Sequence, residues 1–424
     1  MNLIKRKFAL LPHCYLVKGA KRGAIYNLKT KDVYSIDARS LFLLESLEKG
    51  KTLKSALISI PELDSEEMFV YLRNLEILKL GKFISDDETI IKIQFKKPPE
   101  NLHFIWFEVT ASCNLKCIHC YASSNQDNIL KEVMTQKDWE RVIEESYALG
   151  CRRLQFIGGE PLCIGGDNLL GLIQKAKNVG YDFIEVYTNC IMMNKKILEF
   201  FWKNKIAIAT SIYGSNAKVH DLITQQSGSF DKTIETIKEI VKLKLSLRVG
   251  IIEMRQNTEN IKETVKFLRR IGVQRIKIDT VRPSGRGCSQ DLLDSNLINK
   301  QKRKAPLFSK CSLTDFQKAH YGHNCFSDKI CITANGNILP CIMERNIVLG
   351  NILQAPLHEI IYSEKSKKIR NVIKDDIESC RDCEYRYCCF DCRVKAENFY
   401  DKPLNCLYNP YTGRWLEHKE EALI

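Results

Sequence analysis

The sequence has no apolar stretch that approaches the roughly 18 residues of a membrane-spanning helix. Its first residues, MNLIKRKFALLPHCYLVKG, are basic and then apolar, but Pro12 and His13 interrupt the apolar part and no small-residue cleavage site follows. We therefore expect no membrane span, no secretory signal and a cytoplasmic location. With 44% apolar and 27% charged residues among 424, the composition is not that of a disordered chain.

Cysteine is too sparse for a disulfide scaffold, since 18 cysteines are about 4% of the chain and such scaffolds need roughly twice that fraction. In a cytoplasmic protein this number points to metal or redox chemistry instead. The net charge of +14 is compatible with a nucleic-acid partner but does not by itself select a function.

The N-terminal part stands apart because residues 1–100 contain a single cysteine, Cys14, and the polar segment KKPPEN at 96–101 is typical of a linker. We expect a first domain at 1–95 with a winged-helix-like fold. Its expected strands are Phe8–Val17, Ala24–Lys29, Asp32–Ile36 and a closing wing of Lys82–Ile84 and Ile90–Phe95, and its expected helices are Ser40–Glu48, Thr52–Ile58 and Ser65–Leu80.

Residues 102–300 alternate apolar strands with amphipathic helices, which predicts an α/β domain with a parallel sheet. Six such units favour a partial (βα)6 TIM-like barrel, with its chemistry at the carboxyl ends of the strands. The expected strands are Leu102–Val109, Arg153–Ile157, Phe183–Thr188, Ile206–Ile212, Leu247–Glu253 and Arg275–Thr280. The remaining residues, 301–424, form a cysteine-rich domain with weak periodicity.

Three cysteines directly after the first of these strands, Cys113, Cys117 and Cys120, have CxxxCxxC spacing. Three thiolates can hold three irons of a [4Fe–4S] cube and leave the fourth iron open. A zinc site would need a fourth protein ligand, and His119 is poorly placed for that role between two ligand cysteines.

This triad resembles the signature of the radical S-adenosylmethionine (radical SAM) enzymes, and GGEP after the second strand resembles the family motif that binds the amino group of SAM. The resemblance implies that a reduced cluster cleaves SAM to a 5′-deoxyadenosyl radical, which abstracts a hydrogen atom from the substrate. It further implies ribose contacts at the end of strand four, and closure of the SAM pocket by residues at the end of strand five and after strand six. The implied SAM-binding residues are Gly158, Gly159, Glu160, Pro161, Thr210, Ser211, Tyr213, Glu253 and Arg286.

The C-terminal cysteines resemble the SPASM domain of radical SAM peptide maturases, which implies two auxiliary [4Fe–4S] clusters. The implied ligands are Cys325, Cys331, Cys341 and Cys392 for one cluster, and Cys380, Cys383, Cys389 and Cys406 for the other. Cys388 is adjacent to Cys389, so the spacing leaves the choice between these two open. Cys341 is followed by Ile342 rather than by the Asp that sulfatase maturases use, which argues against formylglycine formation.

The N-terminal domain resembles the RiPP recognition element, and the chain as a whole resembles the SPASM maturases that accompany ATP-grasp ligases. The resemblance implies that the leader of a precursor peptide adds as a strand beside Asp32–Ile36, with Ser65–Leu80 as the wall of the groove. It also implies an external electron donor such as a flavodoxin or ferredoxin, and an ATP-grasp ligase in the same pathway.

We therefore expect a leader-guided peptide maturase that forms an oxidative cross-link, either a thioether, a C–C or a C–O bond. The alternative is a peptide epimerase, which needs a hydrogen donor, and Cys311 is the candidate donor. A nucleic-acid-modifying enzyme is disfavoured because the segment 65–78 has Glu66, Glu67 and Glu76 against Arg73 alone.

Overall fold

The computed structural model describes residues 6–58, 64–85, 87–97, 101–128, 133–302, 310–323 and 325–416. The chain divides into two compact units, each described here by itself. The first unit comprises Met1–Pro99, Lys302–Asn324 and Val372–Ile424, and the second Glu100–Gln301 and Cys325–Asn371. None of the helices within the described ranges is long and apolar enough to cross a membrane.

The second unit is built on a nine-stranded sheet in which six consecutive strands are parallel. These six match the expected strands closely, which confirms the partial barrel. They are β6 (Phe104–Glu108), β7 (Arg153–Ile157), β8 (Phe183–Tyr187), β9 (Ala207–Ser211), β10 (Leu247–Glu253) and β11 (Arg275–Thr280). The order β11-β10-β9-β8-β7-β6 shows that each strand lies beside its predecessor in sequence, as expected for right-handed βα units.

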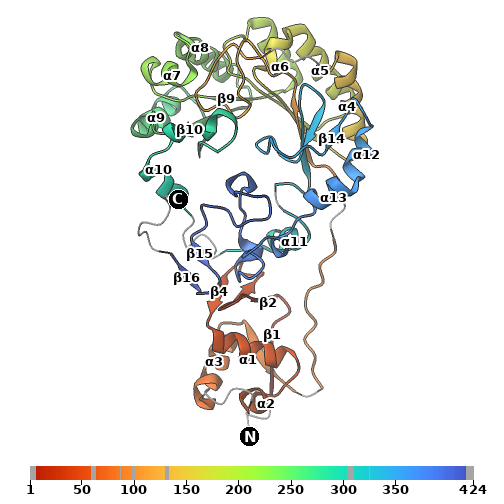
Figure 1. Ribbon diagram of the computed structural model, residues 1–424, viewed down its shortest axis with the longest axis vertical. Coiled ribbons are helices and arrows are strands. Elements are labelled where there is room, and N and C mark those ends of the chain that lie inside the picture. Colours follow the sequence, from red (N-terminus) through yellow and green to blue (C-terminus); the bar gives the residue numbers. More distant parts are fainter. Residues whose placement is uncertain are drawn as a thin grey trace. The chain divides into compact units, whose positions relative to one another are not determined.

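Six helices cover the outer side of the curved sheet (Figure 1). They are α4 (Gln136–Ala148), α5 (Gly166–Val179), α6 (Lys195–Asn204), α7 (Ala217–Thr224), α8 (Ser229–Lys242) and α9 (Ile261–Arg270). Their apolar faces pack on the strands in one core that includes Phe107, Phe156 and Phe201, all fully buried. Thr135 begins α4 with a capping box, in which its side chain and that of Asp138 satisfy each other's backbone N–H groups.

The sheet continues past β6 with strands from much later in the chain. Strand β12 (Lys329–Ile332) pairs in parallel with β6, and β13 (Asn337–Leu339) and β14 (Gly350–Asn351) follow antiparallel. A buried ion pair also joins this extension to β6, since Arg345 donates to both carboxylate oxygens of Glu108 at 2.7 and 3.0 Å. The unit also contains α10 (Ser295–Gln301), α12 (Leu357–Tyr362) and α13 (Glu364–Arg370).

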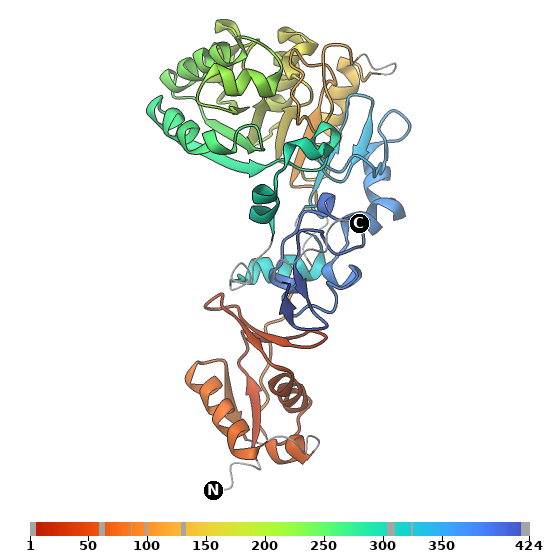
Figure 2. The same cartoon turned by 60° about the vertical axis from the view of Figure 1, so that its left-hand side comes forward.

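In the first unit, an antiparallel sheet of β2 (Cys14–Lys18), β3 (Gly23–Asn27) and β4 (Val33–Ile36) accompanies a separate pair, β1 (Lys7–Leu10) with β5 (Gly81–Ile84). Helices α1 (Ala38–Glu48), α2 (Leu53–Ile58) and α3 (Ser65–Ile77) gather around that pair (Figure 2). The later segments of the unit add α11 (Leu313–Tyr321) and the hairpin β15 (Tyr408–Asn409) with β16 (Arg414–Trp415).

Two strand predictions for this part are wrong. The expected strand Phe8–Val17 is two strands, because Pro12 lacks the N–H that a continuous ladder needs and the chain turns there. The expected wing strand Ile90–Phe95 forms no ladder; Ile93 donates a single backbone hydrogen bond to Pro12 at 3.2 Å, and β5 pairs with β1 instead.

Candidate functional site

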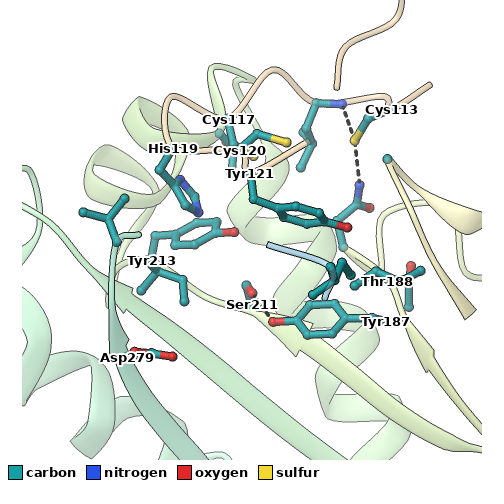
Figure 3. A pocket seen from close by; sticks show the side chains of 18 of the residues that line it. Cys113, Cys117, His119, Cys120, Tyr121, Tyr187, Thr188, Ser211, Tyr213 and Asp279 are labelled. Carbon is teal, nitrogen blue, oxygen red and sulfur yellow. Dashed lines mark hydrogen bonds between the residues drawn. The ribbon is translucent and has the colours of Figure 1, made fainter. Parts of the chain in front are cut away.

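A cavity lies at the carboxyl ends of the parallel strands in the second unit, where segments following β6 to β11 converge. Figure 3 shows Cys113, Cys117 and Cys120 on the loop at one side of it, with Tyr187, Ser211 and Asp279 toward the opposite side. The lining also includes Gly158 and Gly159 after β7, Thr188 and Asn189 after β8, Tyr213 after β9, Ile252 in β10, and Val281 and Arg282 after β11.

The loop after β6 presents all three cysteines of the CxxxCxxC motif to this cavity. Two of the sulfurs accept backbone hydrogen bonds at 3.4 Å, Cys113 Sγ from Leu115 N and Cys120 Sγ from Ser124 N, and such bonds commonly support cluster thiolates. Burial raises the pKa of Cys113 to about 12, so a bound metal would be needed to make it a thiolate.

The cysteine spacing in this loop suits a cluster better than one ion. Within the ranges that the structure describes, no three His, Cys, Asp or Glu side chains converge on the position of a single metal ion. In a cubane site each thiolate binds its own iron, so the sulfurs lie further apart than they do around one ion. Three thiols from Cys113, Cys117 and Cys120 at one cavity match the number of ligands that a cubane with one open iron needs.

Arg286 holds this loop in place and does not line the cavity. Its backbone N–H donates to Cys120 O at 2.9 Å, its Nε to Cys117 O at 2.8 Å and its Nη2 to Ser124 O at 2.7 Å. The preceding Gly285 has φ +55°, and a Cβ there would lie 2.3 Å from Tyr121 O. The position of Arg286 gives no support to direct contact with SAM, since its contacts are with the backbone of the cysteine loop.

The GGEP turn lies directly against the start of the cysteine loop. Gly159 N donates to Thr110 O at 2.7 Å and Glu160 N to Ser112 O at 2.9 Å. Pro161 begins a short 3-10 helix, Pro161–Ile164, as the fixed φ of proline favours. These contacts fix the turn and the loop as one rigid edge of the cavity.

Glu160 is fully buried beneath that edge. Its Oε1 accepts from Thr188 Oγ1 at 2.7 Å and from Leu162 N at 3.2 Å, and its Oε2 accepts from Asn189 N at 2.7 Å. Burial raises the pKa of Glu160 to about 7 despite these hydrogen bonds, which favour the carboxylate. An ammonium group placed beside this carboxylate would lower the pKa again and keep it ionised.

The polar residues expected at the end of β9 divide between the two faces of the sheet, because successive strand residues point to opposite sides. Ser211 and Tyr213 line the cavity, and Ser211 Oγ lies 2.8 Å from Tyr187 Oη. Thr210 instead is fully buried in the core beside Cys190. The ribose role expected for Thr210 therefore has no support from its position.

Glu253 also lies outside the lining of the cavity. Its Oε1 accepts from Thr258 Oγ1 and from Lys300 Nζ, both at 2.9 Å, so the carboxylate is satisfied elsewhere. In its strand, Arg248 and Ile252 reach the cavity instead. The position of Glu253 does not support direct contact with SAM.

Several residues of the cavity were missed from the sequence, among them Asn189 and His220. Asn189 N donates to Glu160, and its side chain donates to Asn114 Oδ1 at 2.6 Å. His220, on α7, is buried and accepts from Tyr213 N on Nδ1 at 3.2 Å, which leaves Nε2 to carry the proton. The pair Thr188-Asn189 at the end of the third strand was a usable signal, whereas nothing in the sequence brings the helical His220 to the site.

Charged groups gather at the side of the cavity away from the cysteines. Arg248 forms a two-point ion pair with the buried Glu185, at 2.9 and 2.8 Å. Asp279 accepts from Arg282 at 2.6 Å, and Lys277 lies on the same strand, β11. This side of the cavity is therefore polar, and each of its two arginines is paired with a carboxylate.

The cysteines expected to bind the first auxiliary cluster fall in both units. Cys325, Cys331 and Cys341 belong to the second unit, and Cys392 to the first. Cys331 is fully buried in β12, and the half-buried Cys341 packs in the same small cluster of side chains. The ligand set of this cluster stays a prediction.

The four cysteines expected for the second auxiliary cluster, Cys380, Cys383, Cys389 and Cys406, line one small cavity in the first unit. Cys388 points elsewhere: its sulfur lies 3.4 Å from Tyr26 Oη and 3.3 Å from Tyr385 O, in an apolar cluster. Four thiols around one cavity match the ligand number of a fully bound cubane. The geometry thus favours Cys389 over Cys388 as ligand.

Cys311 is part of the core of the first unit. It is 2% exposed, its sulfur lies 3.5 Å from Tyr387 O, and it packs with Phe316. Burial raises its pKa to about 12. This environment is typical of a small apolar filler, and gives no support to the hydrogen-donor role.

Comparison with known families matches two segments of the chain. Residues 107–268 match the radical SAM superfamily, and residues 325–384 match the SPASM iron-sulfur cluster-binding domain. The first segment contains the cysteine loop and the GGEP turn, and the second contains five of the eight C-terminal cysteines assigned to auxiliary clusters.

Individual relatives extend over most of the chain. The antilisterial bacteriocin subtilosin biosynthesis protein AlbA of Bacillus subtilis is 25% identical over 78% of this chain and 76% of its own. An AdoMet-dependent heme synthase of Methanosarcina barkeri is 24% identical over 72% of this chain and 96% of its own. The crystal structure of Streptococcus suis SuiB bound to precursor peptide SuiA is 17% identical and superposes with a TM-score of 0.57. The match covers 93% of this chain and 98% of the SuiB chain, and it establishes that the two share a fold.

Proposed function

Because the chain is a radical SAM protein with a SPASM domain, we propose that it modifies a ribosomally made precursor peptide by hydrogen-atom abstraction and oxidative cross-linking. The observation that carries this proposal is the single cavity at which Cys113, Cys117, Cys120 and the GGEP turn meet. The cross-link is a thioether, a C–C or a C–O bond.

The residues of the cavity bind and orient the reactants. Cys113, Cys117 and Cys120 would hold the cluster, and Glu160, next to this edge, would receive the amino group of SAM. When bound, the cluster and SAM supply a radical that abstracts hydrogen. Formation of the cross-link then requires the peptide to lose a second electron and a proton, and the cysteine-lined cavity of the first unit would hold an acceptor for that electron.

The affinity for SAM is expected to rise with pH through about 7. Glu160 binds the ammonium of SAM only as a carboxylate, and burial raises the pKa of Glu160 to about 7, so protonation weakens binding at lower pH. Equilibrium dialysis of SAM at pH 6, 7 and 8 measures the effect. In the Glu160→Gln variant, which has no titrating carboxyl, the affinity should be low and flat across this range; an unchanged slope would contradict the assignment.

The leader of the precursor would add as a strand at the edge of β4. Among the described residues β4 has one strand partner, β3, and its other edge carries only an isolated bridge from Asp32 to Lys310. The open part of the edge is therefore Val33–Ile36, within the segment expected from the sequence. An external electron donor and an ATP-grasp ligase complete the proposed set of partners.

The main alternative, epimerisation, needs a thiol that returns a hydrogen atom to the peptide. The burial of Cys311 does not favour it as that donor. A substrate of another class is suggested by the relative named as a heme synthase, but the open β4 edge favours a peptide.

Anaerobic incubation with SAM, a reductant and the precursor peptide encoded beside the gene tests the proposal. We expect 5′-deoxyadenosine and a peptide lighter by two hydrogen masses per cross-link, only when the leader is present. Unchanged mass with uptake of solvent deuterium would mean epimerisation. Failure to cleave SAM at all would refute the radical assignment.

A further inference from the structure

One buried lysine borders the cavity that Cys380, Cys383, Cys389 and Cys406 line. Lys374 begins a short 3-10 helix, Lys374–Asp376, and its side chain is only 4% exposed. Lysine is almost never fully buried unless it is paired. The position of its ammonium therefore requires anionic neighbours.

Asp391 supplies one negative charge. Nζ of Lys374 lies 2.6 Å from Oδ1 of Asp391, which also lies 2.7 Å from Nε2 of His323. The other carboxylate oxygen accepts from Arg393, whose side chain is fully buried.

The charges of this buried group do not balance. Lys374 and Arg393 contribute two positive charges against the one negative charge of Asp391, which also shares a hydrogen bond with His323. Arg386, which also borders the cavity, is already paired with Asp375 at 2.9 Å. An excess buried positive charge is strongly unfavourable unless a further anion lies nearby.

The cysteine-lined cavity is where that anion belongs. A cubane held by four thiolates carries a net negative charge, and Lys374 borders the cavity that all four sulfurs line. A positive charge at short range stabilises the reduced, more negative cluster more than the oxidised one. The net charge and hydrogen bonding around a cluster are the protein's means of setting its potential.

We propose that Lys374, held by Asp391, is the residue that raises the reduction potential of the cluster bound by Cys380, Cys383, Cys389 and Cys406. It is a positioning residue for electron transfer, since a higher potential lets this cluster accept the second electron that the peptide loses. The inference deepens the proposed function and rests on it.

Redox titration followed by EPR tests this on the full-length chain. The parent carries Cys113→Ala, Cys117→Ala and Cys120→Ala to remove the SAM cluster signal, and the relevant signal is the one that Cys380→Ala eliminates. Lys374→Met is expected to lower the ratio of reduced to oxidised cluster at least about tenfold at fixed potential. For a one-electron couple this corresponds to a reduction potential that is lower by about 59 mV. Lys374→Arg, which keeps the positive charge, should restore most of the original ratio of reduced to oxidised cluster.

Asp391→Asn should shift the reduction potential of the cluster in the opposite direction, because it removes the negative charge and leaves Lys374 and Arg393 in place. We expect it to raise the potential while Lys374→Met lowers it. Lys402→Met is the matched control: Lys402 borders the same cavity but is only half-buried, so water screens its charge and the shift should be small.

The proposal fails if Lys374→Met retains its irons and changes the ratio of reduced to oxidised cluster less than twofold. It also fails if Lys374→Arg changes this ratio as much as Lys374→Met does. If Lys374→Met alone loses its irons, the sign of the Asp391→Asn shift decides. Loss of irons from both variants would mean a purely structural role and would also refute the proposal. A parent chain that binds no iron at these four cysteines would instead overturn the cofactor assignment of the proposed function.

Discussion

Replacing Cys113, Cys117 and Cys120 together by alanine is expected to abolish the cleavage of SAM to 5′-deoxyadenosine. Each thiolate would hold one iron of the SAM cluster, so the triple variant has no site for it. The auxiliary cysteines lie in other segments and should keep their clusters. Iron per chain should fall from about twelve to about eight, four for each remaining cubane.

The measurements are iron analysis after anaerobic reconstitution and chromatography of the nucleoside product. Cys163→Ala is a suitable control, because Cys163 follows the GGEP turn but contacts Met192 and is not among the residues lining the cavity. That variant should retain both the irons and the activity. SAM cleavage that survives in the triple variant would show that the cluster is held elsewhere.

Gly159→Ala is expected to have the second largest effect. A Cβ at Gly159 would lie 2.0 Å from Ser112 O and 2.5 Å from Ser112 C, in the backbone that leads into the cysteine loop. The methyl group must push the turn and the loop apart and break the hydrogen bonds from Gly159 N and Glu160 N. A displacement of about 1 Å at a reacting centre can cost on the order of 100-fold in rate.

We therefore expect SAM cleavage to fall about 100-fold or more in Gly159→Ala, with weaker SAM binding and intact auxiliary clusters. Single-turnover assays and equilibrium dialysis measure both effects. The control is Gly171→Ala on α5, where the nearest atom to the new Cβ would be Gln136 Nε2 at 3.4 Å. Alanine favours the helix there, so this variant should be active and no less stable. Normal SAM binding in Gly159→Ala would contradict the rigid edge described above.

The strands β6 to β11 of the second unit could be predicted from the sequence because they are short apolar runs separated by amphipathic helices, whereas β12, β13 and β14, in the cysteine-rich region, were not predicted. Arg153–Ile157, Leu247–Glu253 and Arg275–Thr280 have the expected bounds. The strand errors lie in the N-terminal part, where hydrophobic runs are interrupted. Phe8–Val17 contains Pro12, and Ile90–Phe95 alternates as a strand would but has no strand partner.

The site was predictable where residues adjacent in sequence act together, and less so where a side chain's direction matters. The CxxxCxxC and GGEP motifs lie within single loops, so their place after β6 and β7 followed from the strand pattern. Thr210 and Glu253 lie at strand ends as expected, yet one is turned into the core and the other is paired with Lys300. Similarly, Cys388 and Cys389 are neighbours that only packing distinguishes.

The parallel pairing of β12 with β6 has a consequence for how the protein is made. Lys329 pairs with Phe104, 225 positions earlier, so one edge of the first barrel strand stays open until the ribosome has synthesised β12. Contacts of such long sequence separation form late and slow the folding of a domain. An unpaired strand edge also invites association with other chains during that interval. The loop that carries Cys113, Cys117 and Cys120 leaves this same strand, so the nascent barrel offers its iron ligands before its sheet is complete.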